Sequence, residues 1–240
     1  MTIDEALAAA GVTASSLMEA DARMLDAQGY VILRGAVAPD VLERLRERFE
    51  ACVLAADRWP VPRERSLRHA MLDNDAEARS FCLSPQMLAA VARVIPHRFF
   101  LTAVQGRDPL PAGGYQALHR DWPDDDPDSH MVSALVFLDP FGPHNGATRL
   151  VPATHRDAGA MHGLGDPDGN HPAQIVVEGQ AGDVLVFHGR LAHSGMRNMT
   201  GAPRRSLLAC YTSHAAYAQR PETRELAALP ALDRYLLGAD

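Results

Sequence analysis

Two histidines and one aspartate stand at positions where their side chains could hold a metal ion. His119 and Asp121 are separated by one residue, and His193 follows His119 by 74 positions. Residues i and i+2 of a strand point to the same face, so His119 and Asp121 would converge from one side. A second strand would bring His193 to the opposite side. Two imidazoles and one carboxylate are the ligand set that binds iron(II) and leaves other coordination positions open.

An arginine downstream of the second histidine adds a second kind of chemistry. Arg204 follows His193 by eleven positions. Its planar guanidinium matches a carboxylate through two parallel hydrogen bonds, so it could hold the far end of an organic acid that chelates the same metal. Arg205 offers the same group. Alternation along a strand sends these two arginines to opposite faces, so only one of them can face the metal.

A chance match is the alternative for the first motif, because the chain has 11 histidines and repeats the pattern at His155-Arg156-Asp157. The first copy is favoured because Gly113-Gly114 introduces it as a turn followed by a strand, and because the distance to His193 leaves room for intervening strands. The second copy runs into an irregular, glycine-rich stretch.

His188 competes with His193 for the role of the distal ligand. Gly182-Asp183 predicts a turn, and the apolar residues after it predict a buried strand that ends at His188. His193 is preferred because Ser194, Gly195 and Asn198 follow it, with Asn198 expected to cap the next turn. Arg204 also lies at a fixed offset from His193.

The elements that must position these residues are mostly short strands. A strand is expected over 29–36, a helix begins at Pro39, and a second helix runs from Pro85 to Pro96. The segment 131–138 is apolar on both faces, as in a strand covered on both sides. The further strands are expected near 99–105, 115–121, 148–151, 174–178, 183–188 and 204–212, with a closing helix from Pro221 onward.

This pattern predicts one domain over 1–240, mainly β with flanking helices, in a sandwich or barrel. The segments 57–80 and 156–173 are rich in proline, glycine and charge, and they are expected to be lids over the site. The acidic run 124–128 could attract a cationic small molecule, although a solvated loop is the commoner meaning of such a run.

Composition narrows the partners. The net charge of −7 argues against nucleic-acid binding, which needs a positive surface. Apolar runs fall short of the roughly 20 residues that span a bilayer, so no membrane partner is expected. The three cysteines are widely spaced and do not form a disulfide framework, and the acidic N-terminus is unlike a signal peptide. A cytoplasmic protein with a small-molecule substrate is predicted.

Four segments together resemble the phytanoyl-CoA dioxygenase family of iron(II)/2-oxoglutarate oxygenases. They read GYVILRGA, GGYQALHRDW, NGATRLVPATH and GDVLVFHGRLAHSGMRNMTGAPRRS, at 29–36, 113–122, 145–155 and 182–206. The resemblance covers most of the chain, and the last segment is the most specific. It implies a double-stranded β-helix, which is the jelly-roll or cupin-like architecture.

The resemblance also implies roles for single residues. His119, Asp121 and His193 would be the iron ligands, and Arg204 rather than Arg205 would bind the C5 carboxylate of 2-oxoglutarate. Two further residues match positions that hold 2-oxoglutarate in similar enzymes, namely Gln116 and Thr148. Trp122 is expected to pack over the site as a lid, and it is a weaker candidate for substrate contact.

The implied activity is hydroxylation of an unactivated C–H of a small molecule, with iron(II), 2-oxoglutarate and dioxygen, and with release of succinate and CO2. Halogenating relatives lack the carboxylate ligand, so Asp121 favours hydroxylation, or a desaturation or cyclisation variant. The alternatives are a cupin-type isomerase, a dioxygenase that does not use 2-oxoglutarate, and a non-catalytic jelly-roll binding module. Neither the substrate nor the oligomeric state can be predicted from these residues.

Overall fold

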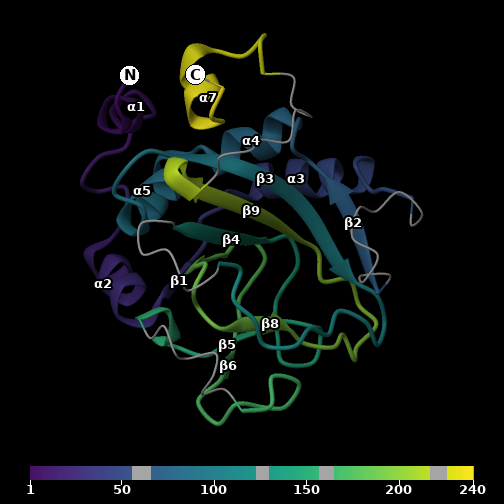
Figure 1. The fold of residues 1–240 in the computed structure, drawn as a ribbon. Coiled ribbons are helices and arrows are strands. Elements are labelled where there is room, and N and C mark those ends of the chain that lie inside the picture. The colour runs from purple at the N-terminus through teal and green to yellow at the C-terminus, as the bar shows by residue number, and fades with distance from the viewer. Residues whose placement is uncertain (56–65, 123–129, 157–164, 217–225, 240) are drawn as a thin grey trace.

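The computed structural model describes residues 1–55, 66–122, 130–156, 165–216 and 226–239, and its main feature is two antiparallel sheets that face each other (Figure 1). The larger sheet has the order β1-β7-β4-β9-β3-β2 and the smaller one the order β6-β5-β8. In chain order the strands are β1 (Tyr30–Leu33), β2 (Leu67–Met71), β3 (Phe99–Pro109), β4 (Met131–Phe137), β5 (Thr148–Leu150), β6 (Ile175–Val176), β7 (Val184–His188), β8 (His193–Gly195) and β9 (Ser206–Ser213). The chain crosses repeatedly between the sheets, which is a jelly-roll arrangement.

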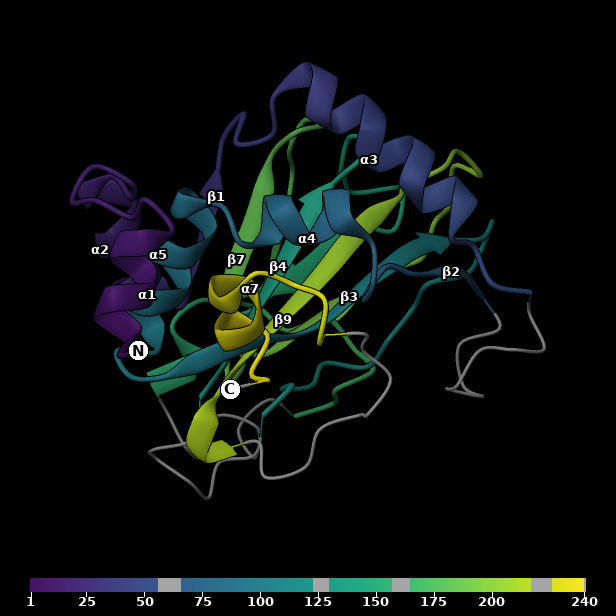
Figure 2. The ribbon, with the colours of Figure 1, turned by 90° about the horizontal axis from the view of Figure 1, so that it is seen from above.

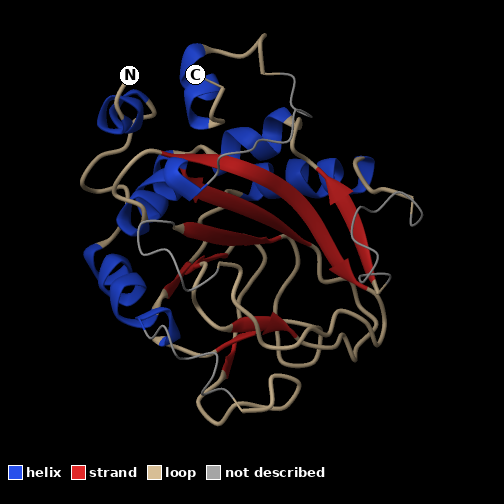
Figure 3. Cartoon of the chain, in the orientation of Figure 1, coloured by secondary structure: helices blue, strands red, loops and turns tan. Residues whose placement is uncertain are grey.

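Helices flank the sheets, mostly on the outer face of the larger one (Figures 2 and 3). The described helices are α1 (Ile3–Ala9), α2 (Glu19–Gln28), α3 (Pro39–Ala51), α4 (Ala76–Cys82), α5 (Pro85–Val94) and α7 (Ala231–Leu236), with short 3-10 turns η3 (Thr154–Arg156) and η4 (His214–Ala216). Seen from above, α3 and α4 lie across the large sheet, and α7 lies near α1, where both termini are found. Among the described residues, no helix has both the length and the hydropathy needed to cross a membrane.

Alternation along the central strands divides the interior into two cores. On β4, Val132, Ala134 and Val136 pack with the helices, whereas Leu135 and Phe137 pack between the two sheets. Successive side chains of a strand point to opposite faces, so one strand supplies both cores. The prediction that 131–138 is covered on both sides is therefore confirmed.

Sequence signals also account for the helix ends. α3 begins with Pro39 at its first position, where a missing N–H breaks no helical hydrogen bond. α2 ends at Gly29, whose φ of 79° places it in the left-handed region that favours glycine. The chain then enters β1 at Tyr30, as the predicted strand over 29–36 requires.

Two expectations about the elements were wrong, at least in part. The strand near 115–121 is absent from the described structure, which has only a single bridge between His119 and His193 there. Within 57–80, residues 67–71 form β2 on the edge of the large sheet, and 76–82 form α4. These residues cannot be a mobile lid in this structure, because Leu72 and Ala78 are fully buried. The polar composition reflects the exposed faces of these two elements.

The other positions at issue fall partly outside the described residues. These are 57–65 and 157–164 of the expected lids, the acidic run 124–128, and the start of the predicted closing helix at Pro221. The C-terminal helix that is described, α7, begins at Ala231. Helices α1 and α2 were not expected from the sequence.

Candidate active site

His119, Asp121 and His193 meet between the two sheets. The Nε2 atoms of His119 and His193 each lie 3.7 Å from Oδ1 of Asp121. The ligand atoms of all three residues lie within 4.8 Å of one another, which is the grouping expected of a metal site. Adjacent ligands held about 2.1 Å from one ion would lie roughly 3 Å apart, so the side chains need only small shifts to share a metal.

The backbone brings the two histidines together. His119 and His193 exchange two hydrogen bonds, with N to O distances of 3.0 and 2.9 Å, although His119 lies outside any regular strand. His193 opens β8 in the smaller sheet. Asp121 is held by its own N–H, which donates to the carbonyl of Gly189 at 2.9 Å. The pairing of two distant segments, and not one strand, therefore places the triad.

Each imidazole is oriented by a carbonyl two residues before it. Nδ1 of His119 lies 2.8 Å from the carbonyl oxygen of Ala117, and Nδ1 of His193 lies 2.9 Å from that of Leu191. A carbonyl only accepts, so Nδ1 must carry the proton in both rings. Nε2 then has a free lone pair aimed at the centre of the triad, as a metal ligand requires.

Ser133 fixes the carboxylate in the same way. Its hydroxyl, on the inner face of β4, donates to Oδ2 of Asp121 at 2.8 Å. This leaves Oδ1, the oxygen nearer both imidazoles, available to a metal. Ser133 was not predicted as a site residue from the sequence. Only the alternation within an otherwise apolar strand could have indicated it, as one polar residue on the inner face.

His119 and Asp121 are held in forms that bind a cation. Burial lowers the pKa of His119, and the neighbouring His193 lowers it further. Burial alone would raise the pKa of Asp121, but His193, His119 and the Ser133 hydroxyl outweigh it and the pKa is lowered. A neutral imidazole and an ionised carboxylate are the states in which these groups coordinate metal.

A cavity of about 260 Å³ opens beside the triad. Arg204 lines it and is buried, with only 6% of its surface exposed. Its guanidinium lies over the ring of Phe141 at 4.5 Å and 3.4 Å from the Ser206 hydroxyl, and its Nε has no hydrogen-bond partner among the described residues. Burial lowers the pKa of Arg204 to about 10, so it stays cationic at neutral pH. The carboxylate of a bound ligand would supply the hydrogen-bond acceptor that this guanidinium lacks.

Arg205 points the other way and is already paired. Its Nε donates to Oδ2 of Asp139 at 2.9 Å, and one terminal nitrogen donates to Oδ1 of the same carboxylate at 2.9 Å. The other terminal nitrogen donates to Glu50 at 3.1 Å. The hydrogen bond with Asp139 is the main reason why the pKa of Arg205 is raised. The two arginines thus separate as strand alternation predicts, with Arg204 facing the cavity.

Gln116 and Thr148 both line the same cavity. Thr148 is buried at the start of β5, directly opposite Gly195 of β8. Oε1 of Gln116 accepts from the N–H of Gly195 at 3.3 Å, which orients the amide. Trp122 is not among the described residues that line the cavity, and its backbone N–H donates to Gly189.

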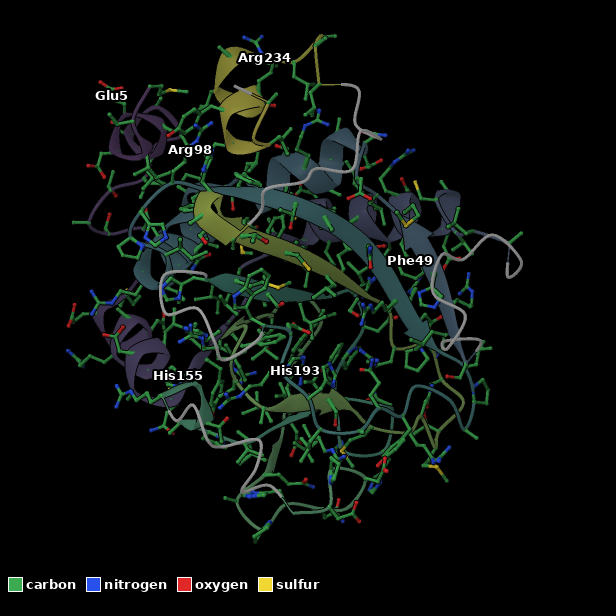
Figure 4. The ribbon with its side chains drawn as sticks, in the orientation of Figure 1. Glu5, Phe49, Arg98, His155, His193 and Arg234 are labelled. Carbon is green, nitrogen blue, oxygen red and sulfur yellow. The ribbon has the colours of Figure 1, made fainter. Side chains whose placement is uncertain are left out.

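The two competing histidines lie elsewhere. Nδ1 of His188 accepts from the N–H of Arg190 at 3.0 Å, and its ring lies 5.4 Å from that of His155. His155 lies beside α2, with Nε2 3.3 Å from the carbonyl of Asp26, well apart from His193 (Figure 4). Neither belongs to the metal-binding group formed by the described residues. Asn198 caps the following turn as expected, since its Oδ1 accepts from the N–H groups of Thr200 and Gly201.

The family model described as "Phytanoyl-CoA dioxygenase (PhyH)" matches residues 25–206, which include the triad and Arg204. The chain belongs to the phytanoyl-CoA dioxygenase family. It is therefore an iron(II)- and 2-oxoglutarate-dependent dioxygenase, as the resemblance of its four segments predicted.

Curated relatives agree with this assignment. Dioxygenase trt7 of Aspergillus terreus is 30% identical over 227 residues, which cover 84% of this chain and 77% of the relative. Iron/alpha-ketoglutarate-dependent dioxygenase ausU of Aspergillus calidoustus is 27% identical over 226 residues, covering 82% of this chain and 71% of the relative.

A solved structure with the same fold is HygX from Streptomyces hygroscopicus, with nickel, 2-oxoglutarate and hygromycin B bound. The TM-score is 0.68 at 18% identity, over 82% of this chain and 88% of that chain. EctD from S. alaskensis, with bound Fe, gives a TM-score of 0.68 at 17% identity, over 88% of this chain and 82% of that chain. The fold is the predicted jelly roll.

The donor set fits the cofactors of this family. The imidazoles of His119 and His193 and the carboxylate of Asp121 would supply three ligands to iron(II), and the adjoining cavity leaves space for exchangeable ligands. The buried, incompletely partnered guanidinium of Arg204 fits the distal carboxylate of 2-oxoglutarate.

Arg149, which was not predicted as a site residue, is almost fully buried on β5. It donates to the Ser194 hydroxyl at 2.6 Å and to the carbonyl oxygens of Gly169 and Pro167 at 2.6 and 3.2 Å. It therefore ties the described part of the loop before β6 to the strand that carries His193. Nothing in its local sequence marks it as more than a strand arginine.

Proposed function

We propose that this enzyme hydroxylates an unactivated C–H bond of a small organic molecule, with release of succinate and CO2, and that residues 1–240 act as one catalytic domain. The observation that carries the proposal is one cavity lined by both the His119, Asp121, His193 group and a buried arginine, Arg204, that forms no ion pair with a carboxylate of the described residues. The rival classes in the jelly-roll fold have no use for such an arginine.

The protein's own groups have separable tasks. His119 and His193 would hold iron(II) through Nε2 and Asp121 through Oδ1, while Ser133 keeps the other carboxylate oxygen occupied. When bound, the iron with 2-oxoglutarate and dioxygen supplies the oxidising chemistry that amino-acid side chains lack. An intact carboxylate ligand favours hydroxylation, or a desaturation or cyclisation variant, over halogenation.

Arg204 would bind the distal carboxylate of 2-oxoglutarate, with Gln116 and Thr148 as further contacts along the cavity wall. The partly dry setting strengthens a charge-assisted pair there, because few waters compete. Leu135, Phe187 and Leu208 form an apolar part of the wall on the inner face of the large sheet. They exclude water from the place where the substrate is oxidised.

A screen for succinate release tests the proposal. Protein reconstituted with iron(II) is incubated aerobically with 2-oxoglutarate and panels of amino acids, amines, carboxylic acids and secondary metabolites, and products are identified by mass. A gain of one oxygen atom with one succinate per turnover is expected, and Arg204→Gln should lose both together. Product formation that does not consume 2-oxoglutarate would overturn the proposal and favour a 2-oxoglutarate-independent dioxygenase. The cytoplasmic location stays a prediction.

A further inference from the structure

A second arginine, Arg107, lines the cavity from the large sheet. It lies on β3 directly opposite Ser206 of β9, which also lines the cavity, and directly paired residues of neighbouring strands share a face. The residue before it, Gly106, faces the helices, because a Cβ there would lie 2.5 Å from the ring of Phe49 on α3. Alternation then directs Arg107 to the opposite face. Figure 4 shows Phe49 and His193 on these two sides of the sheet.

The charge of Arg107 reaches the reacting groups. It is among the causes that lower the pKa values of His119, Asp121 and Arg204, which places the guanidinium near all three. Its Nε is buried without a hydrogen-bond partner, and no ion pair of Arg107 is found within the described ranges. The adjacent carboxylate, Asp108, is held by Arg68 at 3.0 Å and by the N–H of Arg204 at 2.9 Å.

The charged residues that line the cavity carry more positive than negative charge. Asp121 is the single carboxylate among the described lining residues, and Arg107 and Arg204 are cations there. Arg120 is a further cation at the lining, where its guanidinium donates to the carbonyl of Thr154. Iron(II) and the 2-oxoglutarate dianion would cancel each other, so at least one positive charge would remain unmatched. Arg107 is only partly buried, but its Nε is withheld from water, and an anion in the cavity would supply the partner that the guanidinium lacks there.

We propose that Arg107 is the anion-binding subsite for the primary substrate, which is therefore an organic acid with its carboxylate close to the oxidised carbon. The inference rests on the proposed function, because Arg204 and the metal are taken to bind the two carboxylates of 2-oxoglutarate. Leu135, Phe187 and Leu208 of the same cavity would contact the apolar body of this acid.

The test compares two probes of equal shape that differ in charge, cyclohexanecarboxylate and cyclohexanecarboxamide. Protein is loaded with manganese(II) and saturating 2-oxoglutarate, and paramagnetic relaxation of the probe protons reports binding close to the metal. We expect the acid to bind about tenfold more tightly than the amide in the unchanged protein. In Arg107→Gln this preference should fall below about twofold, and Arg107→Lys should keep part of it, since a charge remains.

The affinity for 2-oxoglutarate, measured on the same samples without a probe, separates the two proposals. Arg107→Gln should change it less than about threefold, whereas Arg204→Gln should weaken it at least about thirtyfold. If acid and amide relax equally in the unchanged protein, or if neither relaxes, the subsite does not exist. If Arg107→Gln weakens 2-oxoglutarate as much as Arg204→Gln does, Arg107 is a co-substrate anchor and the proposal is wrong. Failure of the unchanged protein to bind manganese and 2-oxoglutarate would instead reject the proposed function.

Discussion

The chain carries the tripeptide His-Arg-Asp twice, at 119–121 and at 155–157, and the two copies lie in different surroundings. His119 pairs its backbone with His193 and belongs to the metal-binding group. His155 lies in the 3-10 turn η3 and packs against α2 and His188. Asp157 is outside the described residues. The same tripeptide therefore forms part of a metal site only where a second segment of the chain pairs with it.

The two histidines also use their rings in opposite ways. His119 contacts a backbone carbonyl through Nδ1, which leaves Nε2 directed at Asp121 and His193. His155 contacts the carbonyl of Asp26 through Nε2 instead. A metal ligand needs one nitrogen fixed by a hydrogen bond and the other aimed at its partners. Whether each histidine can act as a metal ligand thus depends on which of its ring nitrogens is hydrogen-bonded to the backbone.

The largest expected effect comes from replacing His119, with the replacement of His155 as the control. His119→Ala should abolish turnover and lower the affinity for iron(II) by more than about a hundredfold, because it removes one of three ligands. His155→Ala should keep one iron per chain and a measurable succinate yield. Metal content after dialysis and succinate release, measured on both variants, check the expectation. Full iron content with normal turnover in His119→Ala would show that the triad is assigned wrongly.

Arg204 and Arg205 form a second matched pair, with the next largest effect. Arg204→Ala should weaken 2-oxoglutarate binding by roughly 2–3 kcal/mol, because a charge-assisted pair in a partly dry cavity is lost. Arg205→Ala should change that affinity less than about threefold and should instead lower the free energy of unfolding by about 1–2 kcal/mol, since it leaves Asp139 without its bidentate partner.

Calorimetric titration of 2-oxoglutarate into the manganese-loaded variants measures the first effect, and urea unfolding measures the second. Equal 2-oxoglutarate affinities in the two variants would contradict the assignment of Arg204 to the cavity side of the sheet.

Local sequence was enough to predict the parts of the site that depend on spacing and alternation. The i, i+2 relation of His119 and Asp121 and the opposite faces of Arg204 and Arg205 need only the pattern of residues. The predicted strand around His119 was wrong, because a strand requires a partner along its length. Here the pairing is limited to one bridge with His193. Turn propensity cannot reveal how far such a pairing extends.

Residues whose role depends on an opposite element could not be predicted. Ser133 and Arg107 are ordinary strand residues in the sequence, and they matter because β4 and β3 carry them to the cavity face. The order β4-β9-β3 is non-local, since other elements separate these strands along the chain. The segment 67–82 was misjudged for the same reason: β2 and α4 gain their stability from packing on β3 and α3, which local polarity does not report.

Ser133 gives a smaller effect than loss of a ligand and extends the comparison to the support of the triad. Ser133→Ala should lower metal affinity or turnover by about 10–100-fold, because Asp121 would lose the hydrogen bond that orients it. Thr212→Val is the matched control, since it removes another inner-face hydroxyl, one that lies 3.3 Å from Thr102 and is not bonded to the triad. Iron(II) titration of both variants checks this. A similar loss in Thr212→Val would mean that general packing, and not the bond to Asp121, accounts for the effect.

The smallest expected effect concerns pH and the histidines outside the metal site. The pKa of His188 is lowered to about 3, mainly by burial and in smaller part by the neighbouring His155 and His130. The N–H of Arg190 donates to its Nδ1, which requires the neutral ring. The arginines that face it, Arg190 and Arg120, act in the same direction.

The unfolded chain binds a proton at His188 near pH 6.5, whereas the folded chain does so only near pH 3. The stability that this ring contributes is therefore complete above pH 6.5 and is lost as the pH falls toward 3. The slope is at most about 1.4 kcal/mol per pH unit, and partial solvent access reduces it. Metal-free protein should thus lose about 1 kcal/mol of unfolding free energy between pH 7 and 5.5 through His188.

His188→Gln keeps a hydrogen-bond acceptor but cannot be protonated in this range, so its loss of stability over the same interval should be smaller by that amount. Urea unfolding of both proteins at pH 7 and 5.5, in the presence of a chelator, measures the difference. Equal losses in the two proteins would mean that His188 is not the group that is held neutral. The pH dependence would then have to come from other buried groups, of which His119 and His155, with their lowered pKa values, are the first to replace.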